Sequence, residues 1–175
     1  MLFRSLGFIY ANDFGFTSDP NATVKYSETN TDIFVELLIY EPIETPEILD
    51  LTLNKLNIDK SVPMPCDSSD KYTGENKGTV EMVVGLKKYG YNAFKISKNK
   101  SVMFYLLSMK SKNINIVKNK LTHCAKKEAE NYKFKEINGI QINQPIDKFN
   151  HFWDATRYGH MAWNNTTEII TEWDD

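Results

Sequence analysis

The chain lacks the features that would place it in several large classes of protein. Its 175 residues include two cysteines, Cys66 and Cys124, which lie far apart and form no Cys-x-x-Cys pair. This spacing argues against a disulfide framework and a thiolate zinc site, so we expect a reducing compartment. No apolar run reaches the roughly 18 residues of a membrane-spanning helix, and the first residues show no secretion signal. Neither membrane insertion nor export is indicated.

The chain as a whole is nearly neutral, but one part of it is strongly basic. The net charge is −2, with 21 basic and 23 acidic residues. Between residues 87 and 135, however, thirteen lysines face two acidic residues, which gives +11 there and −13 elsewhere. Such a segment is typical of a surface that binds a polyanion such as nucleic acid, although lysines also cover the solvated sides of amphipathic helices.

Length and composition indicate one folded domain. Hydrophobic residues make up 41% and charged residues 25% of the chain, close to the averages of globular proteins. A domain typically has roughly 100 to 200 residues. We therefore predict a single domain over residues 1–175, with its core at about 7–163 and a C-terminal tail at 164–175.

The pattern of apolar residues predicts an α/β fold. Three strands at 6–14, 22–26 and 33–40 are separated by short turns and form an antiparallel meander. Helices and strands then alternate, with a polar loop at 67–77 and a hairpin around Asn138-Gly139. The predicted later strands are 62–66, 93–96 and 113–117, and the helices are 45–56, 80–89, 101–109, 121–130 and 150–163. This order implies a mixed sheet with helices packed on both faces.

Three carboxylates occupy the ends of these elements. Asp13 closes the first strand, Asp67 follows the strand at 62–66, and Asp154 lies in the last helix, three residues after His151. Oxygen ligands of this kind suit Mg²⁺ or Mn²⁺, and a pair of such ions can clamp the attacking and leaving oxygens of a phosphodiester. Taken singly, each residue has an ordinary structural explanation, as a turn residue or an interior histidine. The same holds for Trp153, which could stack a base but has the spacing of a core residue.

Six segments in chain order resemble the nuclease domain of the large terminase subunit, the DNA-packaging protein of tailed phages. The last segment is the most specific, because it is similar to the Asn-His-x-x-Asp-Ala-x-Arg-Tyr close of that domain. The segments are YANDFGFTSDP at 10–20, PCDSS at 65–69, KKYGYNAF at 87–94, KNKSV at 98–102, EAENYKFK at 128–135 and NHFWDATRY at 150–158.

This resemblance implies a ribonuclease H-like fold and a metal-dependent endonuclease that cuts concatemeric double-stranded DNA during genome packaging. Carried over to matching positions, Asp13, Asp67 and Asp154 are the catalytic, metal-binding carboxylates of a site for two Mg²⁺ or Mn²⁺ ions. His151 is an additional ligand or supports one. Arg157 orients a carboxylate or touches phosphate, and Asp70 or Glu75 has a supporting role.

The resemblance also implies partners. We expect viral DNA to run along lysines of two segments, the loop before the helix at 101–109 and the hairpin. These lysines are Lys95, Lys98, Lys100, Lys133 and Lys135. The implied protein partners are the terminase ATPase domain, the small terminase subunit and the portal protein, in the cytoplasm of the host cell, with no membrane involved.

The sequence departs from the family in ways that leave alternatives open. Ala11 and Asn12 precede the first aspartate where the family usually has glycine and an apolar residue. The phosphate-binding motif of the ATPase motor, G-x-x-x-x-G-K-[ST], is absent from the sequence, so we expect an excised nuclease domain. Another ribonuclease H-like nuclease, such as a junction resolvase, is one alternative. A catalytically weak docking module for packaging proteins is the other.

Overall fold

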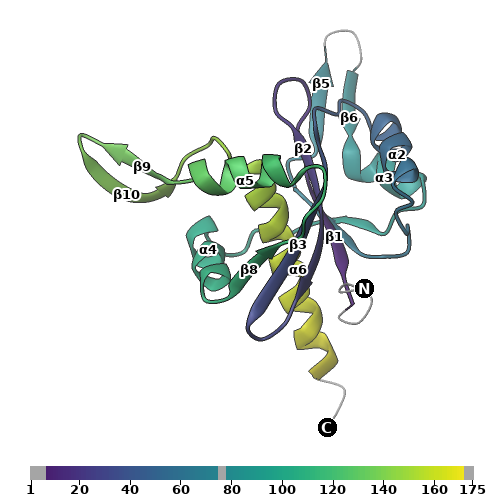
Figure 1. Cartoon of the computed structure of the whole chain (residues 1–175). Coiled ribbons are helices and arrows are strands. Elements are labelled where there is room, and N and C mark those ends of the chain that lie inside the picture. The colour runs from purple at the N-terminus through teal and green to yellow at the C-terminus, as the bar shows by residue number, and fades with distance from the viewer. Residues whose placement is uncertain (1–6, 75–77, 172–175) are drawn as a thin grey trace.

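A mixed sheet of six strands forms the centre of the protein. The computed structural model describes residues 7–74 and 78–171 (Figure 1). The strand order is β7-β4-β1-β2-β3-β8, with antiparallel pairs among β1, β2 and β3 and parallel pairs elsewhere. The bounds are β1 Ile9–Asp13, β2 Asn21–Glu28, β3 Asp32–Glu41, β4 Met64–Cys66, β7 Ala93–Lys95 and β8 Asn113–Ile116. The predicted meander and mixed sheet are confirmed.

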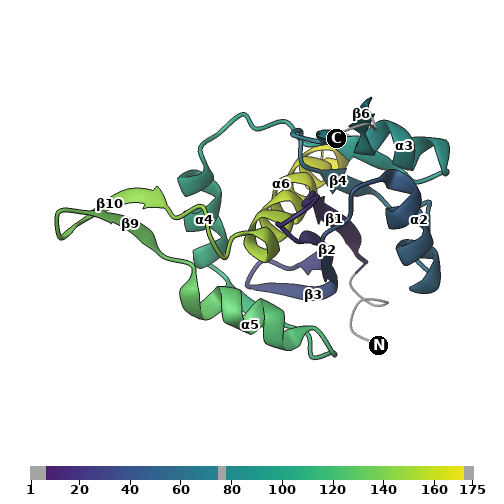
Figure 2. The ribbon, with the colours of Figure 1, turned by 90° about the horizontal axis from the view of Figure 1, so that it is seen from above.

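In the described part of the chain, helices cover both faces of this sheet. They are α2 (Pro46–Lys55), α3 (Met82–Lys88), α4 (Val102–Lys110), α5 (Thr122–Asn131) and α6 (His151–Thr171). One core cluster joins β1, β2 and β3 to α4, α5 and α6, and a second joins the sheet to α2 and α3. Figures 1 and 2 show the two groups of helices on opposite sides of the sheet. The prediction of helices on both faces is therefore confirmed.

A bulge allows β3 to serve both cores. Leu37 pairs with Val24 and packs in the α6 core, whereas Ile39 pairs with Thr23 and packs in the α2 core. Without an extra residue between the pairs, Leu37 and Ile39 would face the same side, because side chains alternate along a strand. The strand thus changes the face that it buries without ending.

The helix α6 lies directly on β2 because Gly159 has no side chain. A Cβ atom at this position would lie 2.8 Å from Cγ of Tyr26, whose side chain is fully buried. Any larger residue would push the helix away from the sheet or displace the tyrosine ring. The position of α6 matters for function, since its first turn carries two of the predicted site residues.

Local sequence signals determine several element ends as predicted. Thr45 caps α2 by accepting a hydrogen bond from the amide of Ile48, and Pro46 occupies the first helical position. Gly90 follows α3 with φ at +89°. The turn at Asn138 and Gly139, with φ at +53° and +79°, joins β9 (Phe134–Ile137) to β10 (Ile140–Pro145).

For the region after β4, the sequence predicted a polar loop followed by a helix from Val80, and the structure differs. A hairpin forms there, in which β5 (Lys71–Gly74) pairs with β6 (Gly78–Glu81), so α3 begins later. The pairing places Lys71 opposite Glu81, whose side chains form an ion pair at 2.8 Å.

The end of the chain also differs from the expected tail. The last helix continues past the predicted end at residue 163 to Thr171, so the tail is helical over part of its length. Across residues 7–74 and 78–171, no helix combines the length and the apolar character needed to span a membrane.

Candidate active site

Asp13 and Asp67 lie side by side because their strands are parallel neighbours. Asn12 of β1 is in register with Cys66 of β4, and the amide of Asp67 donates to the carbonyl of Asn12 at 3.0 Å. Each aspartate comes at the carboxyl end of its strand segment, so both reach the same edge of the sheet. Asp13 shares the side of β1 that Ile9 and Ala11 pack against α6.

Ala11 and Asn12, which differ from the usual residues of the terminase family, do not interrupt the strand β1. Ala11 packs in the α6 core, and Asn12 lies on the opposite side of the strand. The side-chain oxygen of Asn12 accepts hydrogen bonds from Thr23 at 2.5 Å and from Asn21 at 3.1 Å. A buried polar cluster thus replaces the apolar residue that the family usually has before the first aspartate.

The first turn of α6 brings His151 and Asp154 to this edge. His151 Nδ1 lies 3.0 Å from Asp13 Oδ2, and its Nε2 lies 3.9 Å from the exposed Asp19. The negative charge of Asp154 is close enough to raise the pKa of Asp13. The four predicted residues Asp13, Asp67, Asp154 and His151 are therefore neighbours, although they come from three separate parts of the chain.

Glu128 holds the start of α6 in place. Its carboxylate accepts a hydrogen bond from the amide of Phe152 at 2.7 Å and one from the hydroxyl of Tyr40 at 2.6 Å. The residue is almost fully buried, and its negative charge lies at a helix N-terminus, where it is favourable. Sequence reasoning gave Glu128 no role, although it begins the EAENYKFK segment that resembles the terminase family.

Arg157 and Asn150 fix the carboxylate of Asp154. Arg157 lies 2.7 Å (Nη2) and 3.2 Å (Nε) from Oδ1, and Asn150 donates to Oδ2 at 3.1 Å. The arginine is 4% exposed. Arg157 therefore contacts the carboxylate of Asp154 from a buried position, and its expected role in orienting a carboxylate remains a prediction.

Two lysines that were predicted to contact DNA lie against aspartates at this edge. Lys98 Nζ lies 2.5 Å from Asp67 Oδ1, and Lys95 Nζ lies 2.6 Å from Asp70 Oδ1. Asp70 is fully buried, and its other oxygen accepts from the amide of Val83 at the start of α3. Asp70 therefore supports the fold beside the site by capping a helix. The other candidate for a supporting role, Glu75, lies outside the described residues.

The remaining lysines of the predicted DNA path lie around α4 and the β9–β10 hairpin. Lys100 Nζ is 4.1 Å from the centre of the Phe104 ring, and Lys135 forms an ion pair with Asp147 at 2.8 Å. Lys133 lies at the base of the hairpin. The five lysines thus form two groups, one within the carboxylate site and one beyond it.

The electrostatics of the site are those of crowded negative charge. Burial raises the pKa of Asp13 to about 7, and the charges of Asp154 and Asp67 act in the same direction against the hydrogen bond from His151. Burial lowers the pKa of His151, but its hydrogen bond and attraction to Asp13 outweigh this and raise the pKa overall. Burial and the charges of all three aspartates also raise the pKa of Tyr158.

The donor set fits a hard divalent cation, since carboxylate oxygens are the ligands that Mg²⁺ and Mn²⁺ prefer. Within the described ranges, no three acidic, histidine or cysteine side chains are already close enough to enclose a metal ion. Each carboxylate instead contacts a cationic or hydrogen-bonding side chain. Asp67 contacts Lys98, Asp154 contacts Arg157, and Asp13 contacts His151. The ammonium group of Lys98 shows that the oxygen of Asp67 attracts a cation.

No protein-family model matches this chain, and no curated protein matches it significantly. Three solved structures are similar to it. The nuclease domain of the large terminase (g2p) of bacteriophage SPP1, solved with bound Mn, is 23% identical, with a TM-score of 0.67 over 87% of this chain and 84% of that one. The nuclease domain of the P22 large terminase is 16% identical, with a TM-score of 0.64 over 90% and 81%.

The large terminase nuclease of the thermophilic phage G20c is 17% identical, with a TM-score of 0.53 over 90% of this chain and 82% of that one. All three similarities extend over most of both chains. Together with the six-stranded mixed sheet and the helices on both of its faces, they identify the architecture. The chain has the ribonuclease H-like fold of the nuclease domain of phage large terminases.

Proposed function

We propose that this chain is the nuclease domain of a phage large terminase and that it cuts concatemeric double-stranded DNA during genome packaging with the help of divalent ions. The observation that carries the proposal is that paired strands place Asp13 and Asp67 at one edge of the sheet, and that the turn carrying Asp154 contacts Asp13 through His151, in a protein with this fold. The bound Mn of the SPP1 domain supports the choice of cofactor.

Asp13, Asp67, Asp154 and His151 would hold two Mg²⁺ or Mn²⁺ ions. Such ions lower the pKa of a bound water and stabilise the charge that develops on the phosphodiester. The protein's contribution is to fix the ligands. Asp13 and Asp67 are positioned by paired strands, while Asn150 and Arg157 hold both oxygens of Asp154. Ligands that are held in this way need little reorganisation when the substrate arrives.

Lys98 acts as a provisional counterion in this proposal. Its ammonium group neutralises Asp67 at 2.5 Å, and its side chain is 39% exposed, so it can leave the carboxylate without a large rearrangement. The Asp67 oxygen that Lys98 contacts would be a ligand for a divalent ion, so Lys98 would have to give it up when an ion binds. The ammonium group, then free on its exposed loop beside the site, would be attracted by DNA phosphate. Lys98 thus links the charge of the metal site to binding of the substrate.

The DNA path would continue from Lys95, Lys98 and Lys100 to Lys133 and Lys135 at the hairpin. Contacts of this kind depend on salt and carry little sequence information. The protein partners that go with this function are the terminase ATPase domain, the small terminase subunit and the portal protein. The place of action is the cytoplasm of the host cell.

The proposal is tested by nicking of supercoiled plasmid with Mn²⁺, with Mg²⁺ and with EDTA. We expect cleavage with an ion, no cleavage in EDTA, and loss of cleavage in Asp67→Asn. Asp147→Asn is a matched control, because Asp147 is exposed and pairs with Lys135 away from the carboxylates. Circular dichroism would show that each variant is folded.

Two results would replace the proposal. A strong preference for branched over linear duplex would indicate a junction resolvase. No binding of Mn²⁺ or Mg²⁺ in calorimetry, by a folded domain that also fails to nick DNA, would indicate a docking module.

A further inference from the structure

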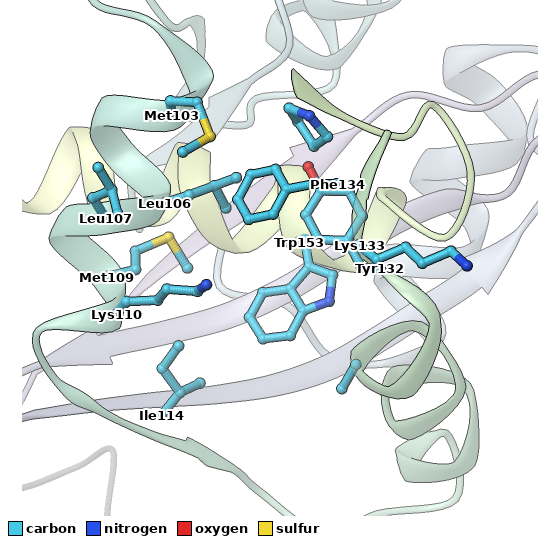
Figure 3. Close-up of a pocket in the computed structure, with 12 residues that line it drawn as sticks. Met103, Leu106, Leu107, Met109, Lys110, Ile114, Tyr132, Lys133, Phe134 and Trp153 are labelled. Atoms are coloured by element: carbon cyan, nitrogen blue, oxygen red, sulfur yellow. The ribbon is translucent and has the colours of Figure 1, made fainter. Parts of the chain in front are cut away.

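A cavity of about 210 Å³ lies beside α4, between this helix, the base of the β9–β10 hairpin and the first turn of α6 (Figure 3). Apolar and aromatic side chains form most of its wall. Those that contribute to the argument are Met103, Leu106, Leu107, Tyr132, Phe134 and Trp153. Figure 3 shows the α4 side chains facing the aromatic rings of the hairpin base and α6 across this space.

The helix α4 is apolar on nearly all sides, yet it is poorly covered. Its sequence is VMFYLLSMK, and Met109 is its one buried residue. Phe104 is 47% exposed and Leu107 is 59% exposed. A helix that is apolar all round is normally buried in a protein core, and a continuous exposed apolar patch marks a site of interaction. The apolar surface extends beyond the cavity, so a small ligand would leave much of it uncovered.

The rim of the cavity is positively charged. Lys110 and Lys133 both line it, and Lys110 Nζ lies 5.5 Å from the centre of the Phe134 ring. Lys100 lies at the other end of α4, against Phe104. A complementary surface therefore combines apolar side chains with flanking negative charge. A helix with one apolar face and acidic residues beside it has this combination, and grooves of this kind bind such helices through side chains spaced at three and four residues.

We propose that α4 and the adjoining cavity form the docking site for an acidic amphipathic helix of a partner protein. Leu107 and Phe104 provide exposed apolar area, the cavity accepts an apolar side chain of the partner, and Lys110 and Lys133 contact its carboxylates. This site is separate from the nuclease carboxylates, so a catalytically inactive variant still binds the partner.

Docking at this place is adjacent to the nuclease site. Trp153 in the wall of the cavity directly precedes Asp154 in α6. The Tyr132 ring stacks on Trp153, with centroids 6.4 Å apart and an angle of 17° between the planes. A helix in the groove therefore contacts the turn that carries His151 and Asp154.

The test uses a fluorescein-labelled synthetic helix of about 18 residues, or five turns, with leucine on one face and glutamate on the others. Fluorescence anisotropy would measure its binding to the wild-type domain. We expect saturable binding that Leu107→Glu weakens at least about tenfold, which corresponds to about 1.4 kcal/mol. Ile140→Glu is the control, because Ile140 is 69% exposed on the hairpin but does not line the cavity. The inactive Asp67→Asn variant should bind as the wild type does.

A charge reversal tests the role of the rim. The double variant Lys110→Glu with Lys133→Glu should lose the glutamate peptide and gain a peptide in which lysine replaces glutamate. Equal binding of a peptide with the same composition in scrambled order would overturn the proposal, as would unchanged binding to Leu107→Glu. If the wild type instead binds short duplex DNA but not the glutamate peptide, and the double lysine variant loses the DNA, the surface would be assigned to nucleic acid.

Discussion

The helix α6 contacts the sheet through two histidines, each of which lies against a different buried carboxylate. His151 Nδ1 lies 3.0 Å from Asp13 of β1, and His160 Nδ1 lies 2.7 Å from Glu28 of β2. Asp13 and Glu28 are equally buried, with 6% exposure each. The two pairs therefore share their helix, their sheet and their degree of burial. Burial and neighbouring groups together account for the differences between them.

Their net effect on the pKa is opposite for the two carboxyl groups. Burial raises the pKa of Glu28, but hydrogen bonds from His160, Lys112 and Tyr26 outweigh it and lower the pKa overall. Burial raises the pKa of Asp13 to about 7, and two further aspartates add to the effect. The Glu28 cluster is complete, because donors satisfy both carboxylate oxygens. The Asp13 cluster has an excess of negative charge, which a bound cation would neutralise.

The largest expected effect is loss of nuclease activity in Asp13→Asn. Removing a residue that only supports a metal ligand commonly costs about 10- to 100-fold, so loss of a ligand itself should cost more than about 100-fold. Stability should stay equal or rise, because the change removes one of three crowded negative charges. Plasmid nicking and urea unfolding measure the two quantities. A variant that cleaves at the wild-type rate would remove Asp13 from the site.

The corresponding change of acid to amide in the Glu28–His160 pair should lower the stability of the fold. Glu28→Gln leaves Lys112 without its buried counterion, and breaking such a pair costs about 3 kcal/mol in the free energy of unfolding. Urea unfolding at pH 7 measures this loss. Binding of Mn²⁺ by the folded variant, followed by calorimetry, should match the wild type. Weakened metal binding with intact stability would contradict the division between the two pairs.

The two carboxyl groups should also give opposite pH dependence in EDTA. The folded pKa of Asp13 lies above its unfolded value of about 3.8, so the wild type loses stability relative to Asp13→Asn as the pH rises from about 4 to about 7. The lowered pKa of Glu28 makes its contribution present above the unfolded value near 4.5 and lost as the pH falls through the folded value. The deficit of Glu28→Gln should therefore shrink in acid. The free energy of unfolding would be measured for the wild type and both variants from pH 3 to 8. Curves that run parallel across this range would contradict the comparison.

The smallest effect concerns the provisional counterion. Lys98→Ala should raise the affinity for Mn²⁺ in the absence of DNA by about 3- to 10-fold, because a half-exposed ion pair contributes about 1 kcal/mol. Calorimetry measures this affinity directly. Lys100→Ala is the control, since Lys100 lies against a phenylalanine ring. Equal Mn²⁺ affinity in all three proteins would show that Lys98 does not compete with the ion.

The parts of the fold that were predictable depend on local sequence. The Thr45-Pro46 start of α2 and the Asn138-Gly139 turn are examples, because capping and positive φ are properties of neighbouring residues. The β5–β6 hairpin was missed because it depends on pairing of 71–74 with 78–81, whose polar and glycine residues have no clear strand period.

The members of the site were predictable, but their partners were not. Asp13 and Asp67 could be placed at strand ends and Asp154 with His151 on the last helix, and the resemblance implied their roles. The cation that faces Asp67 depends on tertiary packing, so the contact of Lys98 with Asp67 needed the structure. The contact of His160 with Glu28, which are 132 residues apart, left no signal in the sequence.

Gly159 lies between the two histidines of α6, against the ring of Tyr26. The helix can lie this close to the sheet because residue 159 has no Cβ atom. Gly159→Ala would wedge the helix outward and carry His151 and Asp154 away from the two strand aspartates. The accuracy of a site at one end of α6 depends on the absence of a single carbon atom two turns away.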